Sequence, residues 1–134
     1  LGKLLDVGLA IVDKRRPAPG KSQVMNVIGN VKDKTCILVD DIIDSGGTIV
    51  NAAKALKDRG AKEVYVYITH GVLTGDAIKK IKKSIIKKLV ITDTIDNLGK
   101  TNKINNIEVL SIANLMGEAI KRISNSTSVS DLFK

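Results

Sequence analysis

The sequence predicts an α/β fold in which a mostly parallel sheet is flanked by helices. Apolar runs of strand length alternate along the chain with stretches of helical periodicity, and residues 35–69 complete one strand, helix and strand unit. The 134 residues have the length of one domain, and no internal repeat or low-complexity linker divides them. We therefore expect a single domain over residues 1–134, with 124–134 as a polar C-terminal tail.

Apolar runs define the expected strands, and a period near 3.6 residues defines the expected helices. The predicted strands are residues 7–12, 24–29, 35–39, 63–69, 89–94 and 108–112. The predicted helices are residues 48–60, about 75–87, and a last helix whose apolar stripe is Ile112, Leu115, Met116, Ala119, Ile120 and Ile123. The first residues, "LGKLLD", resemble the end of a further helix.

Two of these elements carry expectations about burial. The run "TCILV" (35–39) is continuously apolar, as in a strand that is buried on both faces, and its Cys36 is interpreted as core filler. The stripe of the last helix is expected to face a core. By contrast, "DKRRPAPGK" (13–21) is a predicted loop, because its two prolines fix φ and remove backbone donors.

Composition narrows the classes of partner. The net charge of +8 favours anionic ligands, but aromatic residues make up only 2% of the chain, which argues against a platform that stacks bases. The lysines at 79, 80, 82, 83, 87 and 88 are interpreted as a solvated helix face. No apolar stretch is long enough to span a membrane, and no leader opens the chain, so we expect a cytoplasmic protein without nucleic-acid or membrane partners.

The segment "VDDIIDSGGT" (39–48) lies at the predicted turn from a strand into a helix. Such turns lie at the carboxyl edge of a parallel sheet, where ligands of open α/β proteins bind. Gly46 and Gly47 allow the backbone to approach a ligand closely. The free N–H groups from Ser45 to Thr48, with the two hydroxyls of those residues, predict a phosphate cradle at the positive end of the helix.

Three carboxylates, those of Asp40, Asp41 and Asp44, flank this cradle. Carboxylates so close together repel one another unless cations or hydroxyl donors offset their charge. A sugar supplies hydroxyls and Mg²⁺ supplies charge. A phosphorylated sugar, with its phosphate in the turn and its diol against Asp40 and Asp41, would satisfy both halves of the segment.

Simpler interpretations of this segment fit less well. It has neither the spacing of a Walker A loop nor that of a dinucleotide fingerprint. A plain helix start capped by Asp44 or Ser45 would need one side-chain oxygen, and it would not need three carboxylates and two glycines. His70, the single histidine, is interpreted first as a hydrogen-bonded structural residue, and its place after a strand keeps it a candidate for the site.

The segment 39–48 resembles the phosphoribosyl-binding loop of the phosphoribosyltransferase-like superfamily. The wider stretch from "LAIVDKRRPAPG" (9–20) to "THGVLTG" (69–75), with "VITDTI" (90–95) and "SVSDLF" (128–133), resembles the ribose-phosphate pyrophosphokinase family. The resemblance implies a type I phosphoribosyltransferase-like fold. It also implies transfer of diphosphate from MgATP to the 1-hydroxyl of ribose 5-phosphate, with release of AMP.

The resemblance assigns roles to residues of this chain. Lys14 and Arg16 would be catalytic, on a basic loop that closes over the transferred group. The ribose 5-phosphate contacts would come from Arg16, Asp40, Asp41, Asp44, Ser45, Gly46, Gly47 and Thr48. Mg²⁺ would be a cofactor carried by the nucleotide, with no metal ligand in this chain.

Family members have two similar α/β domains, and the chain resembles only the second. Most of the ATP site, which the resemblance places in the first domain, would therefore lie outside this chain, and the full-length form would be a homo-oligomer. Two other functions stay open. One is a phosphoribosyltransferase of nucleotide salvage, against which "DKRRPAPG" argues, and the other is a non-catalytic module that binds or senses a sugar phosphate.

Overall fold

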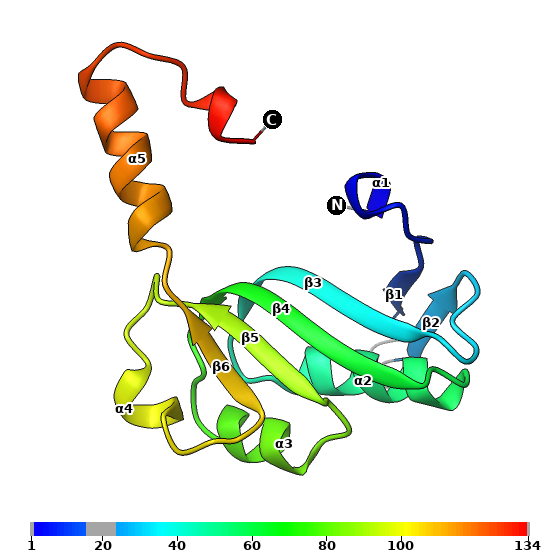
Figure 1. The fold of residues 1–134 in the computed structure, drawn as a ribbon. Helices are drawn as coiled ribbons and strands as arrows, with labels where there is room; N and C mark the ends of the chain where they lie inside the picture. Colours follow the sequence, from blue (N-terminus) through cyan, green and yellow to red (C-terminus); the bar gives the residue numbers. More distant parts are fainter. Residues whose placement is uncertain (1, 16–23, 134) are drawn as a thin grey trace.

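The computed structural model describes residues 2–15 and 24–133, and it confirms an α/β fold (Figure 1). A parallel sheet contains, in spatial order, β3 (Thr35–Ile43), β4 (Glu63–Gly71), β5 (Lys88–Thr92) and β6 (Ile107–Leu110). Its connections contain α2 (Gly47–Asp58), α3 (Ala77–Lys83) and α4 (Leu98–Thr101). Outside it lie α1 (Gly2–Leu5), the antiparallel pair β1 (Ile11–Arg15) and β2 (Val24–Ile28), α5 (Ala113–Ser124) and a 3-10 helix (Ser130–Phe133).

The order of the strands explains where the helices lie. Each strand of the sheet pairs in parallel with the next one along the chain, so the three connections all advance in the same direction. Because crossovers between parallel strands are right-handed, connections that advance one way place their helices on one face of the sheet. Figure 1 shows α2, α3 and α4 on the lower face, as this rule requires.

The core lies between the sheet and this helical layer. Alternate residues of each strand point to the same face, and on the covered face the central strands β4 and β5 contribute the buried residues Val64, Val66, Ile68, Leu89 and Ile91. The helices contribute buried apolar residues, which are Ile49, Ala53 and Leu56 from α2 and Ala77 and Ile81 from α3. The predicted apolar face of the helix at 48–60 is confirmed.

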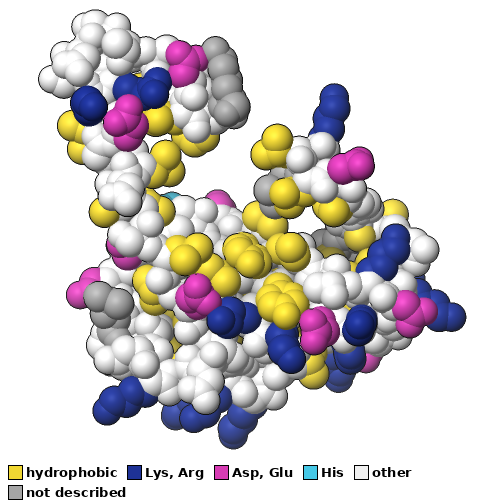
Figure 2. Space-filling model, viewed as in Figure 1, with side chains coloured by type: hydrophobic (Ala, Val, Ile, Leu, Met, Phe, Trp, Pro, Cys, Tyr) yellow, Lys and Arg dark blue, Asp and Glu magenta, His cyan; other side chains and the backbone are white. Residues whose placement is uncertain are grey.

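The opposite face of the sheet is open, which corrects the prediction for residues 35–39. Ile37 is 52% exposed and Val39 is 58% exposed, so β3 is buried on one face only. Tyr67 and Leu110 are also exposed on this side, and Figure 2 shows hydrophobic side chains gathered over the strands between α5 and α1. The apolar run resembled a doubly covered strand because its outward residues are apolar too.

The last helix also differs from expectation. α5 forms where its periodicity predicted a helix, but its apolar stripe does not face a core, and α5 contains no buried residue. Met116, Ile120 and Ile123 are 50%, 62% and 67% exposed. Figure 1 shows α5 projecting from the sheet after β6. Periodicity reports that a helix has an apolar face, but it does not report what covers that face.

The N-terminal strand is shifted relative to the prediction. A strand was expected at 7–12 and a loop from residue 13, whereas β1 covers Ile11–Arg15, and Lys14 pairs with Met25 of β2. A two-stranded antiparallel pair leaves side chains in solvent, so charged residues are compatible with it. β2 matches the strand expected at 24–29, but it pairs with β1 and does not join the edge of the main sheet. The prolines of the predicted loop lie outside the described residues.

Other boundaries moved for local reasons. β3 continues to Ile43, so Asp40 and Asp41 lie within the strand and not after it. α3 ends at Lys83, well before residue 87, because the Ser84 hydroxyl donates to the Ile81 carbonyl at 2.7 Å and accepts from the Ile86 N–H. The segment between the strands expected at 89–94 and 108–112, where no helix was expected, contains α4. Among the described helices, none has the length and apolar character needed to cross a membrane.

Candidate functional site

The turn between β3 and α2 carries most of the residues singled out from the sequence. β3 ends at Ile43, residues 44–46 form the bend, and α2 begins at Gly47. Gly46 precedes the helix with a φ of 74°, in the left-handed region that glycine adopts without strain. The sequence therefore places a glycine where the backbone needs one.

The start of α2 has no side-chain cap. The first hydrogen bond of the helix runs from the Val50 N–H to the Gly46 carbonyl at 3.1 Å. The N–H groups of Gly47, Thr48 and Ile49 have no carbonyl partner within the helix, as at the start of every α-helix. Neither Asp44 nor Ser45 caps the start of α2. These three N–H groups therefore remain available to an acceptor outside the chain.

The carboxylates lie on both sides of this turn. Asp40 and Asp41 are exposed near the end of β3, and Asp44 is exposed in the bend. An oxygen of Asp40 accepts the N–H of Asp41 at 3.0 Å. The Asp44 side chain faces the neighbouring loop, where it accepts the Thr74 hydroxyl at 2.5 Å. Asp40 and Asp41 therefore remain accessible to a ligand, whereas the Asp44 carboxylate already has a protein partner.

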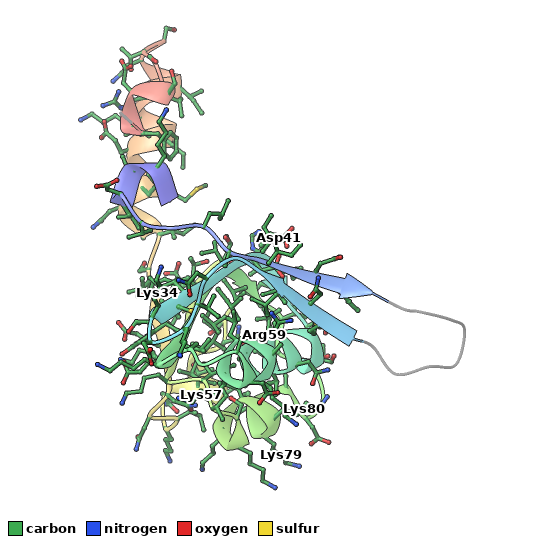
Figure 3. All side chains as sticks on the ribbon, turned by 90° about the vertical axis from the view of Figure 1, so that its right-hand side faces the viewer. Lys34, Asp41, Lys57, Arg59, Lys79 and Lys80 are labelled. Atoms are coloured by element: carbon green, nitrogen blue, oxygen red, sulfur yellow. The ribbon has the colours of Figure 1, made fainter. Side chains whose placement is uncertain are left out.

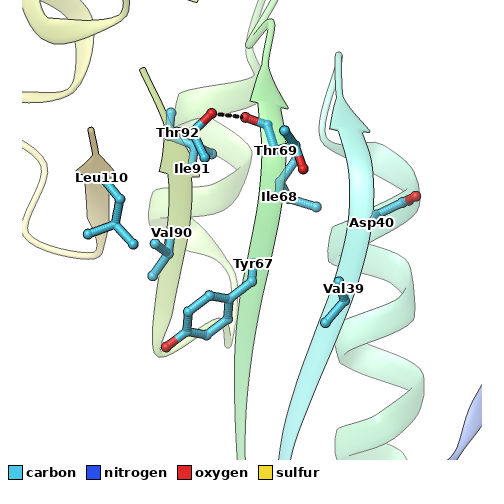
Figure 4. Close-up of a pocket in the computed structure, with 9 residues that line it drawn as sticks. All are labelled: Val39, Asp40, Tyr67, Ile68, Thr69, Val90, Ile91, Thr92 and Leu110. Carbon is cyan, nitrogen blue, oxygen red and sulfur yellow. Dashed lines mark hydrogen bonds between the residues drawn. The ribbon is translucent and has the colours of Figure 1, made fainter. Parts of the chain in front are cut away.

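A shallow pocket of about 180 Å³ opens beside Asp40 on the uncovered face of the sheet. Figure 4 shows Val39, Tyr67, Val90 and Leu110 grouped in it, while the Asp40 carboxylate points away from them. The lining is mostly apolar, so this pocket suits a phosphate less well than the start of α2 does.

Hydroxyl groups gather where β4 and β5 end, and the sequence analysis did not single them out. The Thr92 hydroxyl donates to the Thr69 carbonyl at 2.6 Å, and the Thr94 hydroxyl lies 2.9 Å from Nδ1 of His70. His70 is thus hydrogen-bonded, as its structural interpretation predicts. The sequence does contain a signal for this group, because threonines recur at the ends of two strands that were expected to be parallel. The carboxyl ends of parallel strands meet at one edge of a sheet, so these hydroxyls could have been expected to lie together.

The basic segment lies on a different element from the turn. Lys14 is exposed on β1, in the antiparallel pair, and not on the turn between β3 and α2. Arg16 lies outside the described residues. β2, the partner of β1, is tied to the far end of α2, where Arg59 donates to the Val27 carbonyl at 3.4 Å. Figure 3 labels Arg59, just after α2, and Asp41, on β3.

Other reactive groups offer little to the site. Burial raises the pKa of the Cys36 thiol, and the nearby Lys34 lowers it by less, so this thiol is a poor nucleophile. Cys36 packs against the core, which agrees with its interpretation as core filler. The described residues contain no group of three or more His, Cys, Asp or Glu side chains that could hold a metal ion.

Comparisons with known proteins give the chain a family. The family model described as the phosphoribosyl synthetase-associated domain matches residues 10–134. A ribose-phosphate pyrophosphokinase of Hyphomonas neptunium is 56% identical over 131 residues, which are 98% of this chain and 42% of that protein. One of Bradyrhizobium diazoefficiens is 58% identical over 133 residues, or 99% and 42% of the two chains.

A solved structure agrees with the sequence relatives. The crystal structure of phosphoribosylpyrophosphate synthetase from Mycobacterium smegmatis superposes with a TM-score of 0.79 at 36% identity, covering 93% of this chain and 41% of that one. The chain thus spans about 42% of the length of the curated relatives it matches. The resemblance stated from the motifs is confirmed, and the chain belongs to the phosphoribosyl synthetase-associated domain family.

Proposed function

We propose that this chain supplies the ribose 5-phosphate site and the catalytic basic segment of a ribose-phosphate pyrophosphokinase. The whole enzyme would transfer diphosphate from MgATP to the 1-hydroxyl of ribose 5-phosphate, giving 5-phosphoribosyl 1-diphosphate and AMP. The observation that carries the proposal is the uncapped start of α2, with Gly46 in the left-handed region and two accessible carboxylates just before it on β3. The names of the relatives support the same activity.

The donors at the start of α2 suit a phosphate. The N–H groups of Gly47 and Thr48 point along the helix axis, and the exposed Thr48 and Ser45 hydroxyls add two further donors. The helix dipole alone favours an anion by only about 0.3–1 kcal/mol. Most of the affinity would therefore come from directed hydrogen bonds to the phosphate oxygens.

Asp40 and Asp41 would bind the ribose diol. Carboxylates accept hydrogen bonds from hydroxyl groups, and such charge-assisted bonds are about twice as strong as neutral ones. Both side chains are exposed and close in sequence to the phosphate donors. Asp44 would contribute through its backbone, because its carboxylate is bonded to Thr74.

Lys14 and Arg16 would act on the diphosphate. The 1-hydroxyl oxygen attacks the β-phosphorus of ATP, loses its proton, and displaces AMP as the bond to the bridging oxygen breaks. Negative charge grows on the transferred group and on AMP, and cations placed there stabilise the transition state. Lys14 lies on a separate antiparallel pair, and from there it would reach the group bound at the turn.

The remaining parts of the enzyme are also proposals. Residues 1–134 would be the C-terminal domain of the two-domain enzyme, with 124–134 as its tail. Mg²⁺ would arrive with ATP, since the described residues do not provide a cluster to hold it. The ATP site would be completed by the other domain, and the full-length enzyme would be a cytoplasmic homo-oligomer.

Binding variants test the sugar-phosphate site directly. We expect Gly46→Val to abolish ribose 5-phosphate binding, because a β-branched residue is strained at a φ of 74°. Asp40→Asn should weaken binding about 10-fold or more, the range for a lost hydrogen bond to a charged group. Lys14→Ala should leave binding nearly unchanged. Calorimetric titration of the 134-residue chain measures all three.

Asp58→Asn is the matched control. It removes the same charge as Asp40→Asn, but from the last residue of α2, at the end of the helix that lies away from the proposed site. If Asp58→Asn weakened binding as much as Asp40→Asn, net charge would explain the loss, and the assigned role of Asp40 would be wrong. Absence of ribose 5-phosphate binding by the folded wild-type chain would refute the proposed site.

Turnover distinguishes the enzyme from its alternatives. The chain is incubated with MgATP and ribose 5-phosphate, alone and together with the remaining domain of a relative. Release of AMP only in the mixture supports the proposal, and Lys14→Ala should then reduce turnover far more than affinity. Binding without turnover in both cases would indicate a sugar-phosphate module. Turnover only with a nucleobase and the activated sugar would indicate a phosphoribosyltransferase.

A further inference from the structure

The bend before α2 is hydrogen-bonded along one side to the loop that follows β4. The carbonyl of Ile43 accepts the N–H groups of Val72 and Leu73, at 2.9 and 3.2 Å. The carbonyl of Asp44 accepts the Thr74 N–H at 3.2 Å, and the Asp44 carboxylate accepts the Thr74 hydroxyl at 2.5 Å. Thr74 thus contacts Asp44 twice, once through each of its donors.

Helix α3 continues this contact. The Lys80 ammonium donates to the Ser45 carbonyl at 3.1 Å. A Cβ added to Gly46 would lie 3.6–3.7 Å from atoms of Ala77, which is itself fully buried. The backbone from residue 43 to residue 46 therefore lies against residues 72–80.

These contacts determine where the donors of the bend point. In a trans peptide the carbonyl and the N–H of the following residue point in opposite directions, and the described peptides are all trans. The carbonyls of Ile43, Asp44 and Ser45 are held toward the β4–α3 side. The next N–H groups, of Asp44, Ser45 and Gly46, must then point away from that side. Three successive N–H groups that face one way form an anion-binding concavity.

We propose that Thr74 and Lys80 are positioning residues that hold the backbone of residues 44–46 in its anion-binding shape. This inference rests on the proposed function, because it concerns the same phosphate site. Neither residue needs to touch the ligand: Thr74 orients the bend through Asp44, and Lys80 orients it through the Ser45 carbonyl. Lys80 also brings a positive charge to the site, which favours an anion.

Lys79 provides a matched comparison. It is the neighbour of Lys80 on α3, and both are exposed and labelled in Figure 3. Lys79 pairs with Asp76 at 2.9 Å and makes no contact with the bend that the structure records. Lys79→Ala and Lys80→Ala remove the same charge from adjacent positions of one short helix. Because Lys80 is the one that donates to the Ser45 carbonyl, only Lys80→Ala should disturb the bend.

The first measurement needs no ligand. Amide hydrogen exchange of residue 74, whose N–H donates to the Asp44 carbonyl, should become about 5- to 10-fold faster in Lys80→Ala and in Thr74→Val of the 134-residue chain, as expected when one hydrogen bond that supports the bend is lost. Lys80→Arg and Thr74→Ser keep a donor and should restore the wild-type rate. Circular dichroism shows whether each variant is folded. If Thr74→Val does not fold, the comparison of Lys80→Ala with Lys80→Arg still tests the inference.

The second measurement uses ribose 5-phosphate and ribose as paired ligands. Lys80→Ala should weaken ribose 5-phosphate about 5- to 10-fold and leave ribose unchanged within about twofold. Equal exchange rates in Lys80→Ala and Lys79→Ala would overturn the inference. So would an equal loss of affinity for both ligands. If the wild type binds no ribose 5-phosphate, the proposed function fails, and the exchange rates still decide whether Thr74 and Lys80 hold the bend.

Discussion

Gly71, at the end of β4, has the least space for a side chain among the described glycines. A Cβ built there would lie 2.7 Å from Cδ1 of Ile91 and 3.3 Å from its Cβ and Cγ2. Ile91 is fully buried, so it has little room to move. The Gly71 carbonyl also accepts the side-chain amide of Asn97, which fixes the loop before α4. The glycine allows β4 and β5 to pack closely where their ends approach the site.

We expect Gly71→Ala to lower the free energy of unfolding by about 1–3 kcal/mol, the usual cost of overpacking a core. Urea denaturation of the 134-residue chain measures it. Gly117→Ala is the control: a Cβ there meets nothing within 4 Å, and alanine in a helix is favoured over glycine by about 0.8–1 kcal/mol. A Gly71 variant as stable as the wild type would mean that Ile91 can adopt another rotamer.

Sequence reasoning at the residue scale singled out the turn between β3 and α2, but it did not find the residues that contact this turn from α3 and its preceding loop. Gly46 and Gly47 are visible in a sequence because glycine marks unusual backbone. Thr74 and Lys80 are ordinary in their own segments, and their contact with the bend exists only because β3 and β4 are neighbours. Residues that act through a tertiary contact carry no local signal.

At the scale of elements, the junction of β6 and α5 depends on one carboxylate. An oxygen of Asp93, just after β5, accepts the N–H of Ile112 at 2.9 Å. Hydrogen bonds from the Ser111 side chain and from the Ile112 backbone hold the pKa of Asp93 below its ordinary value of 3.8. The charged carboxylate therefore stabilises the folded chain.

This shift predicts a pH dependence with a definite sign. The pKa of Asp93 is lower in the folded chain than in the unfolded chain. The stability that the charged carboxylate contributes is therefore complete when the pH is above the pKa of the unfolded chain. It is lost as the pH falls through the pKa of the folded chain. The stability difference between wild type and Asp93→Asn should be largest at neutral pH and should be lost in acid, as pH falls below the ordinary pKa of 3.8 and through the lower pKa of the folded chain. Urea denaturation at a series of pH values measures it.

Ser111→Ala provides the accompanying control. It removes the largest cause of the lowered pKa, so the stability that depends on Asp93 should be lost at a higher pH than in the wild type. A difference between wild type and Asp93→Asn that stayed constant from pH 7 to pH 2 would contradict this account of the junction.

Elements were predictable where local pattern decides them. β4 and α2 lie close to their expected positions because their apolar residues face the core with the regular period. β1 was misplaced because its pairing with β2, which the pattern does not encode, continues through charged residues. The existence of α5 was predictable and its environment was not, since amphipathicity is the same whether or not a partner is present.

At the scale of the whole molecule, one face of the sheet carries the helices and the other is open. A matched pair of substitutions on neighbouring strands tests this asymmetry. Ile68, on the covered face, is 3% exposed, and Ile37, on the open face, is 52% exposed. Ile68→Ala should cost about 2–5 kcal/mol of unfolding free energy, the range for an emptied core site. Ile37→Ala should cost less than about 1 kcal/mol.

Denaturant titration of both variants in the 134-residue chain gives the comparison. Equal costs would show that Ile37 is covered in solution. The sequence could not reveal this asymmetry, because the outward residues of β3 are as apolar as its inward ones. A parallel sheet usually has both faces covered, and that general rule led the prediction to the wrong burial for residues 35–39.

The position of β3 gives its two aspartates a second consequence. β3 lies at one edge of the main sheet, and among the described strands none pairs with its outer side. An edge of nine residues is long enough to recruit a strand from another molecule, and charged side chains are a common defence against such pairing. We therefore expect Asp40 and Asp41 to help keep concentrated solutions of the chain from aggregating. A ligand that covered both carboxylates would remove that protection for as long as it stayed bound.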